Sequence, residues 1–522
     1  MATISEALAL AFALHERGEL AQAEQIYRRI LDVQPANADV LHRLGVLILQ
    51  SGRADEAVTL LERAVALDPR DGGMAANLGA AYTVASRHED ARRTLQAAVE
   101  RDPSNAGAFM NLGNTLYLLG RLDEAAAALQ SCLQRAPEHG AAHGNLGVVL
   151  QDLGRLEEAQ ACYERAVELN PESAMAHANL GTLLKDRGRL TDALDCFARA
   201  LAIQPDCQPA LCGRGTVLLS QGDFSAGWAD YENRIGCQQF NTLQFPQPRW
   251  DGSPLGDRTL LIHCEQGLGD TFQFIRYLKL VAQRASKIVV ACEPQLIPLL
   301  TDSGVPGLVE RKGPLPPFDV HAPLMSLPLI FGTTVDTIPR DVSYLTVDQG
   351  RIAKWRLELG RYEGLKVGIA WQGAKSFARD RTRSIPLEQF APLAKVPGVR
   401  LFSLQKGQGS EQLAALADRF PVIDLARDLD PPGEAFLDTA AVMQCLNLVV
   451  TSDSAPAHLA GALGVNVWVA LARVPEWRWM FERADSPWYP TMRLFRQRQS
   501  GDWPAVFAEM AAELAKLAGG SS

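Results

Sequence analysis

The chain has 522 residues, of which 47% are hydrophobic and 21% charged, and its formal net charge is −9. A chain of this length is too long for one hydrophobic core, so we expect two or three domains. The mildly acidic balance argues against general binding to nucleic acids or to anionic membranes. No stretch of about 18 apolar residues, the length that spans a bilayer, is present in the sequence.

The nine cysteines are scattered, with no CxxC pair and no zinc-ligand spacing. Several fall inside helical or strand patterns, where a free thiol packs as a small apolar group. The apolar run Ala7–Leu14 follows no Lys or Arg and fits the repeat described next, so we expect no signal peptide. These features predict reduced thiols and a cytoplasmic location.

A period of 34 residues runs through the first half of the chain. It is carried by a proline series, two glycine series and an alanine series. The positions are Pro35, Pro69, Pro103, Pro137, Pro171 and Pro205; Gly18, Gly52, Gly120, Gly154, Gly188 and Gly222, with Ser86 in the gap; Gly45, Gly79, Gly113, Gly147, Gly181 and Gly215; and Ala23, Ala57, Ala91, Ala125, Ala159 and Ala193. The first glycine series predicts left-handed residues that close helices. The second glycine series and the alanines predict closely paired helices, and proline ends each unit.

This pattern resembles the tetratricopeptide repeat (TPR), a helix–turn–helix unit that stacks into an α-solenoid. Six full units and a degenerate seventh account for residues 1–235. Such arrays bind extended peptides along a concave face, so we expect a protein partner in the groove. Homo-oligomerisation through the repeats stays open.

An asparagine series sharpens the expectation of peptide binding. Asn77, Asn111, Asn145 and Asn179 recur at the same step, each in an Asn-Leu-Gly triplet, and Arg43 and Gly213 interrupt the series at its ends. An amide offers donors and an acceptor, so a ladder of amides can pair with a peptide backbone of any sequence. The ladder resembles that of protein O-GlcNAc transferases. The alternative is that each asparagine bonds a neighbouring helix.

The second half has a different organisation. Residues 236–256 contain Pro and Gly and predict a linker. Short β-rich runs then alternate with helical ones, beginning with "TLLIHCE" and "KIVVACE" and continuing through "KVGIAW", "VRLFSL", "LNLVVTSD" and "NVWVAL". This alternation predicts parallel sheets with crossover helices. We expect two Rossmann-like subdomains, at 257–350 and 351–522, facing a cleft.

The stretch "EQGLGDTFQFIRYL" follows the first predicted strand, where ligands of parallel sheets lie. Gly267 and Gly269 allow the backbone to approach a ligand, and Asp270 is expected at a helix start facing the cleft. Glu265 lies on the same turn. An N-terminal capping role is the alternative for Asp270. The chain has neither GxGxxG nor GxxxxGK, so neither NAD nor a P-loop is supported.

A second stretch, "TSDSAPAHLAGALG", takes a strand into a helix at Pro456. Backbone N–H groups and the positive end of the helix dipole would face a ligand there, and a diphosphate suits them. The donor-binding candidates of this stretch are Asp453, Ser454, Ala455 and His458.

Cationic and amide side chains follow two further predicted strands. Trp371 and Gln372 open a loop after "KVGIAW", and "SLQKG" ends the next strand. The donor-binding candidates are Trp371, Gln372, Lys375, Arg379, Arg381 and Arg383 in and before the loop, with Gln405 and Lys406 in "SLQKG". Cations can stabilise a departing nucleotide phosphate without a metal. No Asp-x-Asp lies in a predicted cleft position, so we expect neither a metal nor another cofactor; a solvated basic loop is the alternative.

The pair "GLGD" and "SDSAPAHLAGALGV" resembles the heptosyltransferase-like glycosyltransferases, family nine of the GT-B fold. Together with the repeats, the chain is similar to bacterial TPR glycosyltransferases, including those that modify flagellins. The resemblance implies that Asp270 is the catalytic base, with Glu265 as the alternative, and that the donor is a nucleotide-sugar. It also implies metal independence and an inverting outcome. Ala455 departs from the glycine usual in that family.

The resemblance implies transfer of a sugar to Ser or Thr hydroxyls of an acceptor protein held by the array. A UDP-hexosamine and a CMP-nonulosonate both remain open as donors. A second hypothesis makes the acceptor a lipid-linked or polysaccharide sugar, with the repeats as a partner scaffold. A third treats the chain as a non-catalytic docking protein.

Overall fold

The computed structural model describes residues 3–236, 243–374, 380–425 and 429–519. The chain divides into two compact units. The first runs to Leu183 and includes Ala202–Pro205, and the second comprises Leu184–Leu201 and everything from Asp206 onward. Among the described residues, no helix is both long and apolar enough to cross a membrane.

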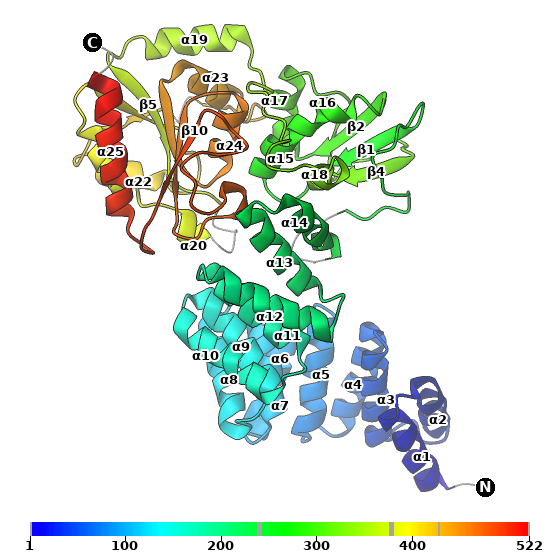
Figure 1. Ribbon diagram of the computed structural model, residues 1–522. Helices are drawn as coiled ribbons and strands as arrows, with labels where there is room; N and C mark the ends of the chain where they lie inside the picture. Colours follow the sequence, from blue (N-terminus) through cyan, green and yellow to red (C-terminus); the bar gives the residue numbers. More distant parts are fainter. Residues whose placement is uncertain (1–2, 237–242, 375–379, 426–428, 520–522) are drawn as a thin grey trace. The chain divides into compact units, whose positions relative to one another are not determined.

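The repeat region is a succession of antiparallel helix pairs (Figure 1). Each pair repeats the 34-residue period seen in the sequence. The helices are α1 (Ile4–Glu16), α2 (Leu20–Val33), α3 (Ala38–Gln50), α4 (Ala54–Leu67), α5 (Gly72–Val84), α6 (His88–Arg101), α7 (Ala106–Leu118), α8 (Leu122–Arg135), α9 (Gly140–Leu153), α10 (Leu156–Leu169), α11 (Ala174–Asp186), α12 (Leu190–Ile203), α13 (Gln208–Gln221) and α14 (Phe224–Tyr231).

The periodic small residues have the predicted roles. Gly52 has a φ of +78° after α3, and Ser86 adopts a φ of +60° in the same place after α5. A Cβ on Gly79 would lie 2.3 Å from Leu95 Cγ, so this glycine lets α5 and α6 approach closely. The alanines of the fourth series are fully buried. The array is therefore determined by contacts between neighbouring helices.

The second unit contains two parallel sheets. The first has the strand order β3-β2-β1-β4 and the second the order β10-β9-β8-β5-β6-β7. The strands are β1 (Thr259–His263), β2 (Lys287–Cys292), β3 (Leu308–Glu310), β4 (Val320–Pro323), β5 (Leu365–Ala370), β6 (Val399–Ser403), β7 (Ile423–Asp424), β8 (Leu448–Ser452), β9 (Val467–Leu471) and β10 (Met492–Arg496). Leu261 pairs with Val289 in the first sheet, and Ile369 pairs with Val450 in the second.

Short helices connect these strands and cover the sheets. They are α15 (Leu268–Phe274), α16 (Leu278–Val281), α17 (Ile297–Asp302), α18 (Leu327–Ile330), α19 (Gln349–Leu359), α20 (Asp380–Arg383), α21 (Ala391–Ala394), α22 (Glu411–Leu416), α23 (Leu437–Cys445), α24 (Ala455–Ala462) and α25 (Trp503–Gly519). The second unit is therefore an α/β structure, as predicted.

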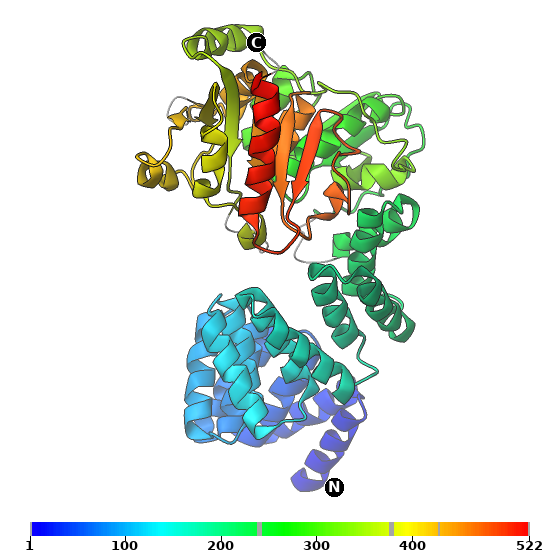
Figure 2. The same ribbon diagram turned by 60° about the vertical axis from the view of Figure 1, so that its left-hand side comes forward.

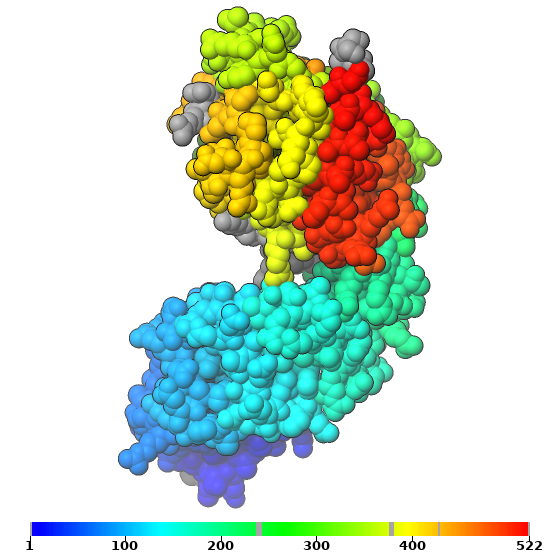
Figure 3. All heavy atoms as spheres, turned by 90° about the vertical axis from the view of Figure 1, so that its left-hand side faces the viewer, coloured from blue at the N-terminus to red at the C-terminus, as the bar shows by residue number. Residues whose placement is uncertain are grey.

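The C-terminal helix α25 belongs to the second sheet. It lies along this sheet (Figure 2). Its Phe507 and Met510 share one core with Val367 of β5 and Phe390. Figure 3 shows the outer face of α25 at the surface, in red. The apolar stripe of α25 is thus buried on the second sheet.

Candidate active site

The glycine turn (Glu265–Gly267) joins β1 to α15. Helix α15 begins at Leu268, two residues earlier than Asp270, so Asp270 occupies the first helical turn. The Gly267 backbone N–H donates to Asp270 Oδ2 at 2.7 Å. The carboxylate thus caps the helix through one oxygen and leaves the other for a different partner.

That partner is Arg478, which comes from the loop after β9. Arg478 Nη2 donates to Asp270 Oδ1, and Arg478 Nη1 donates to Glu476. The guanidinium carbon lies 4.4 Å from the centroid of the Trp477 ring. The Asp270 side chain is 17% exposed and that of Arg478 is 7% exposed. A carboxylate from the helix that follows β1 of the first sheet is therefore paired with a cation from the segment that follows β9 of the second sheet.

The surroundings of Asp270 change its acidity. Burial raises the pKa of Asp270, and the positive charge of Arg478 partly opposes that rise. Burial favours the neutral form of a carboxyl group because the charged form loses its water. A carboxylate with a raised pKa is a stronger base than an exposed one, which suits proton abstraction.

Helix α15 packs directly against α24. A Cβ on Gly269 would lie 2.8 Å from His458 Cδ2 and 3.5 Å from Ala455 Cα. Gly269 therefore provides close approach between two helices, whereas the sequence suggested close approach to a ligand. The two motifs that the sequence singled out, one from each sheet, meet at this contact.

His458 is a buried, neutral side chain. Burial lowers its pKa well below the usual value, and the charges of Arg478, Arg276 and Arg383 lower it further. Its Nδ1 lies 3.0 Å from the hydroxyl of Tyr489, and its ring stacks on Trp479 with a centroid distance of 5.0 Å. These contacts fix the ring against α24, so its orientation is set by the protein.

The start of α24 contains the other residues of the second motif. Ser454 is the N-terminal cap residue and is 5% exposed, and its hydroxyl donates to the Ser452 carbonyl at 3.3 Å. Asp453 and Ala455 are half-buried. The Ser454 hydroxyl does not cap the helix. Of the next residues, Pro456 has no N–H, and the Ala457 N–H donates to the Ser454 carbonyl at 2.9 Å.

Glu265 has a very different environment from Asp270. It is 2% exposed, and its Oε1 accepts from Arg234 Nη2 at 2.6 Å. Arg234 is fully buried and also donates to Glu232 Oε2 at 2.8 Å and to Ser326 Oγ at 2.9 Å. Buried pairs of this kind fix geometry, because removing one partner leaves an uncompensated charge.

Gln266 adopts a φ of +60° between these two carboxylates. This conformation costs a residue with a side chain about 1–3 kcal/mol, so the surrounding structure must hold it. Gln266 Nε2 donates to the Tyr231 hydroxyl at 3.2 Å. Burial raises the pKa of Tyr231 to about 12, so the phenol is neutral at physiological pH.

Of the predicted basic loop, the structure brings Arg383 to the site. Arg383 Nε donates to Asp380 Oδ1 at 3.4 Å, and its charge acts on both Asp270 and His458. Arg381 is exposed. Lys375 and Arg379 lie outside the described residues. One of the predicted cations therefore contributes to the electrostatics around Asp270.

The residues predicted from "WQG" and "SLQKG" are hydrogen-bonded to one another. Gln405 Oε1 accepts from the backbone N–H groups of Trp371 and Gln372 at 3.0 Å each, and Gln405 Nε2 donates to the Gln372 and Gln408 carbonyls. The amide of Gln405 is thus occupied in holding the loop after β5. Lys406 Nζ donates to the Leu429 and Asp430 carbonyls at 2.5 and 2.8 Å. Trp371 is fully buried.

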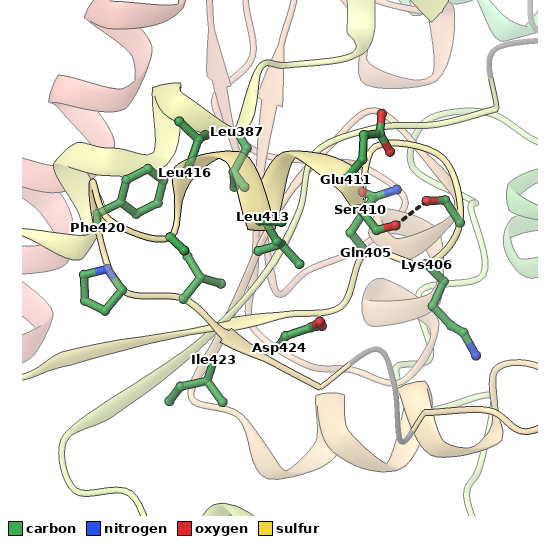
Figure 4. Close-up of a pocket in the computed structure, with 15 residues that line it drawn as sticks. Leu387, Gln405, Lys406, Ser410, Glu411, Leu413, Leu416, Phe420, Ile423 and Asp424 are labelled. Atoms are coloured by element: carbon green, nitrogen blue, oxygen red, sulfur yellow. Dashed lines mark hydrogen bonds between the residues drawn. The ribbon is translucent and has the colours of Figure 1, made fainter.

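A hollow of about 660 Å³ opens beside these strand ends (Figure 4). Its apolar wall comes from Leu413, Leu416 and Phe420, and its polar end contains Lys406 and Asp424. An apolar wall with a few polar groups at one end is typical of small-molecule sites.

The asparagine ladder is partly engaged within the array. Asn77 Nδ2 lies 2.7 Å from His42 Nε2, and burial lowers the pKa of His42, so the neutral ring can accept this bond. Asn145 Nδ2 donates to Asn114 Oδ1 at 2.8 Å. Asn111 and Asn179 are half-buried. Two of the four amides therefore bond a neighbouring repeat, which was the alternative to peptide binding.

Sequence reasoning missed Arg478, the ion-pair partner of Asp270. It stands in "WRWM", between Trp477 and Trp479, which are both buried. An arginine between two buried tryptophans was the available signal. Arg276 was missed as well; it is 3% exposed and donates to the Pro339 and Trp488 carbonyls.

Comparisons with known proteins support the repeat array. Tetratricopeptide-repeat family models match residues 14–82, 48–111, 104–172, 138–206 and 179–235. Protein FlbA of Caulobacter vibrioides is 28% identical over 326 residues, which are 57% of this chain and 53% of FlbA. The chain thus spans about half the length of the curated relative it matches.

Solved repeat structures are similar to part of the chain. TTC0263, a TPR protein of Thermus thermophilus, is 26% identical, with a TM-score of 0.32, over 35% of this chain and 99% of its own. PilF of Pseudomonas aeruginosa is 21% identical, with a TM-score of 0.35, over 38% of this chain and 90% of its own. The first half of the chain is a TPR helical array, a scaffold type suited to protein interaction.

Proposed function

We propose that the chain is a glycosyltransferase of the GT-B type that moves a sugar from a nucleotide-sugar to a Ser or Thr hydroxyl of an acceptor protein. The observation that carries the proposal is the pairing of Asp270 with Arg478 where α15 meets the start of α24. It supports the proposal because a carboxyl group with a raised pKa lies next to the N-terminal end of a helix, where the helix dipole favours negative charge.

In the proposed reaction, Asp270 accepts the proton of the acceptor hydroxyl. The hydroxyl oxygen forms a bond to the anomeric carbon as the bond from that carbon to the phosphate oxygen breaks. The bonding electrons leave with the phosphate. Arg383 and the first turn of α24 would stabilise this negative charge. Arg478 would orient Asp270, and its positive charge would favour the ionised form of the Asp270 carboxyl group.

Three arginines lie around Asp270 and His458, and carboxylates balance their charge. Arg276, Arg383 and Arg478 act on His458, which is neutral. Arg276 donates to carbonyls and to the Tyr344 hydroxyl, so no carboxylate is among these partners. Arg478 is paired with Asp270 and Glu476, and Arg383 with Asp380, so three carboxylates balance the charge of the three arginines.

We assign the base to Asp270 and a structural role to Glu265. Glu265 is bonded to a fully buried arginine, so proton abstraction by Glu265 would remove one of the two carboxylates that offset the Arg234 charge. Asp270 is more exposed and has the raised pKa.

The repeat array would hold the acceptor protein. The half-buried amides of Asn111 and Asn179 support backbone binding at those positions, whereas Asn77 and Asn145 would have to exchange an existing hydrogen bond. The donor pocket would include the hollow beside β6 and β7.

The test is transfer itself. The full chain is incubated with UDP-, GDP-, dTDP- and CMP-linked sugars, and free nucleotide is measured with and without a cell extract as a source of acceptors. We expect release that depends on one donor, together with a mass increase on a protein of the extract. Mass increase on a lipid or glycan alone would favour the second hypothesis, and release from none would contradict the proposal.

A further inference from the structure

The last repeat of the array is built into the α/β unit. Helices α13 and α14 belong to the same compact unit as the two sheets. Trp228 of α14 donates through Nε1 to the Thr333 carbonyl at 3.1 Å, and its ring lies 5.3 Å from that of Trp477. Figure 1 shows α14 next to α18 and α15.

This last repeat holds the glycine turn through two polar contacts. Tyr231, the last residue of α14, accepts from Gln266 at 3.2 Å. Arg234, in the 3₁₀ helix Glu232–Gly236 that follows, donates to Glu265 at 2.6 Å. Glu265 lies two residues before Gly267, whose backbone N–H donates to Asp270.

The same repeat also supports the partner of Asp270. The Tyr231 ring lies 5.6 Å from the Trp477 ring, and the Arg478 guanidinium carbon lies 4.4 Å from the centroid of the same Trp477 ring. Helix α14 therefore contacts the turn before Asp270 and the segment that contains Arg478. A change in α14 would move both members of the ion pair.

We propose that Tyr231 and Arg234 are positioning residues, through which the last repeat sets the geometry of Asp270. This inference rests on the proposed catalytic role of Asp270. The strained φ of Gln266 shows that the turn needs outside support, and Tyr231 and Arg234 supply it on either side. The last repeat and the residue pair after it are thus in direct contact with the glycine turn.

The test uses the full chain with a paired substitution, Arg234→Met with Glu265→Met, which removes both charges together and leaves neither buried alone. The matched control is Arg493→Met with Glu513→Met. Arg493 of β10 and Glu513 of α25 pair at 2.6 Å beside the second sheet, whereas the glycine turn follows β1 of the first sheet. Hydrogen exchange followed by mass spectrometry reads the peptide that covers residues 264–271.

We expect amide exchange in this peptide to rise by about tenfold in the Arg234/Glu265 variant and to stay unchanged in the control. Equal changes in both variants, or no change in either, would overturn the proposal. If the paired variant does not fold, Tyr231→Phe is measured in the same way; it removes only the hydroxyl, and an unchanged turn would then overturn the proposal.

Steady-state kinetics distinguish a positioning role from a purely structural one, because only misplacement of the catalytic group should lower kcat at constant donor KM. With a transferring donor, kcat of the paired variant should fall by about 100-fold while the donor KM stays constant, because misplacement of a catalytic group affects the chemical step. A rise in KM with constant kcat would contradict positioning. If the wild-type chain transfers no sugar, the proposed function fails, whereas the exchange experiment still decides whether α14 holds the turn.

Discussion

The two carboxylates flanking the glycine turn lie in opposite surroundings. Glu265 is buried against Arg234, which has further bonds to Glu232 and Ser326. Asp270 keeps an exposed edge, has a raised pKa and shares Arg478 with Glu476. A carboxylate enclosed by fixed donors serves structure, whereas one with a raised pKa at an accessible edge can exchange a proton.

The largest effect that separates these carboxylates should come from Asp270→Asn. This change keeps the shape and one acceptor oxygen but removes the base, so kcat should fall by about 10²- to 10⁴-fold. Sugar transfer at saturating donor measures it, with nucleotide binding as the control for folding. If the variant retains more than a tenth of the wild-type kcat, Asp270 is not the catalytic base.

For stability we expect the opposite order: breaking the Arg234–Glu265 pair should cost more unfolding free energy than Asp270→Asn. Arg234→Met leaves Glu265 charged and buried, which should cost about 3–5 kcal/mol of unfolding free energy. The paired Arg234→Met/Glu265→Met variant should regain most of this loss. Urea unfolding monitored by circular dichroism makes the comparison with Asp270→Asn, for which we expect a much smaller cost. Equal costs for the two sites would mean that their surroundings do not differ as described.

The pH dependence sharpens the comparison further. Because the pKa of Asp270 is raised in the folded state, activity should fall with acid at a pH above the ordinary aspartate value of about 3.9. The stability contribution has the opposite sign: it declines as the pH rises from that value through the raised pKa, since ionisation is less favourable in the folded chain. Unfolding of wild type and Asp270→Asn between pH 3 and 8 tests this, and parallel curves would contradict it.

The smallest effect is expected in the array. Asn111→Ala removes one half-buried amide and should weaken binding of an extended polypeptide by about 1 kcal/mol, or roughly fivefold in Kd. Calorimetry with a synthetic Ser-Gly repeat peptide measures it, and the exposed Asn170→Ala outside the ladder is the control. Equal binding by both variants would argue against the ladder.

The repeat array could be predicted almost completely from the sequence. Its contacts join neighbouring helices, so the residues that make them recur every 34 positions, as Gly79 against Leu95 illustrates. The six β-rich runs of the second half also correspond to strands. By contrast, β3 and β7 are too short for a periodic signal.

The candidate site could be predicted only in part. Asp270 and the start of α24 stand in recognisable motifs, but Arg478 is 208 residues away from its ion-pair partner, and no local pattern indicates that distance. The role of Gln405 was predicted as donor binding because the sequence cannot show that its amide is already satisfied by backbone groups. Burial and pairing, which distinguish Glu265 from Asp270, appear only in three dimensions.

The most direct measurement is the melting temperature of the full chain with UDP, GDP, ADP, dTDP, CMP or CDP. A ligand at 100 times its Kd stabilises the native state by about 2.7 kcal/mol, so at least one nucleotide should raise the melting temperature saturably. Ala455→Asp, which places a negative charge in the first turn of α24 where it also suits the helix, should abolish the shift. If no nucleotide shifts the wild-type melting temperature, or if the shift survives in Ala455→Asp, the account of the donor site is contradicted.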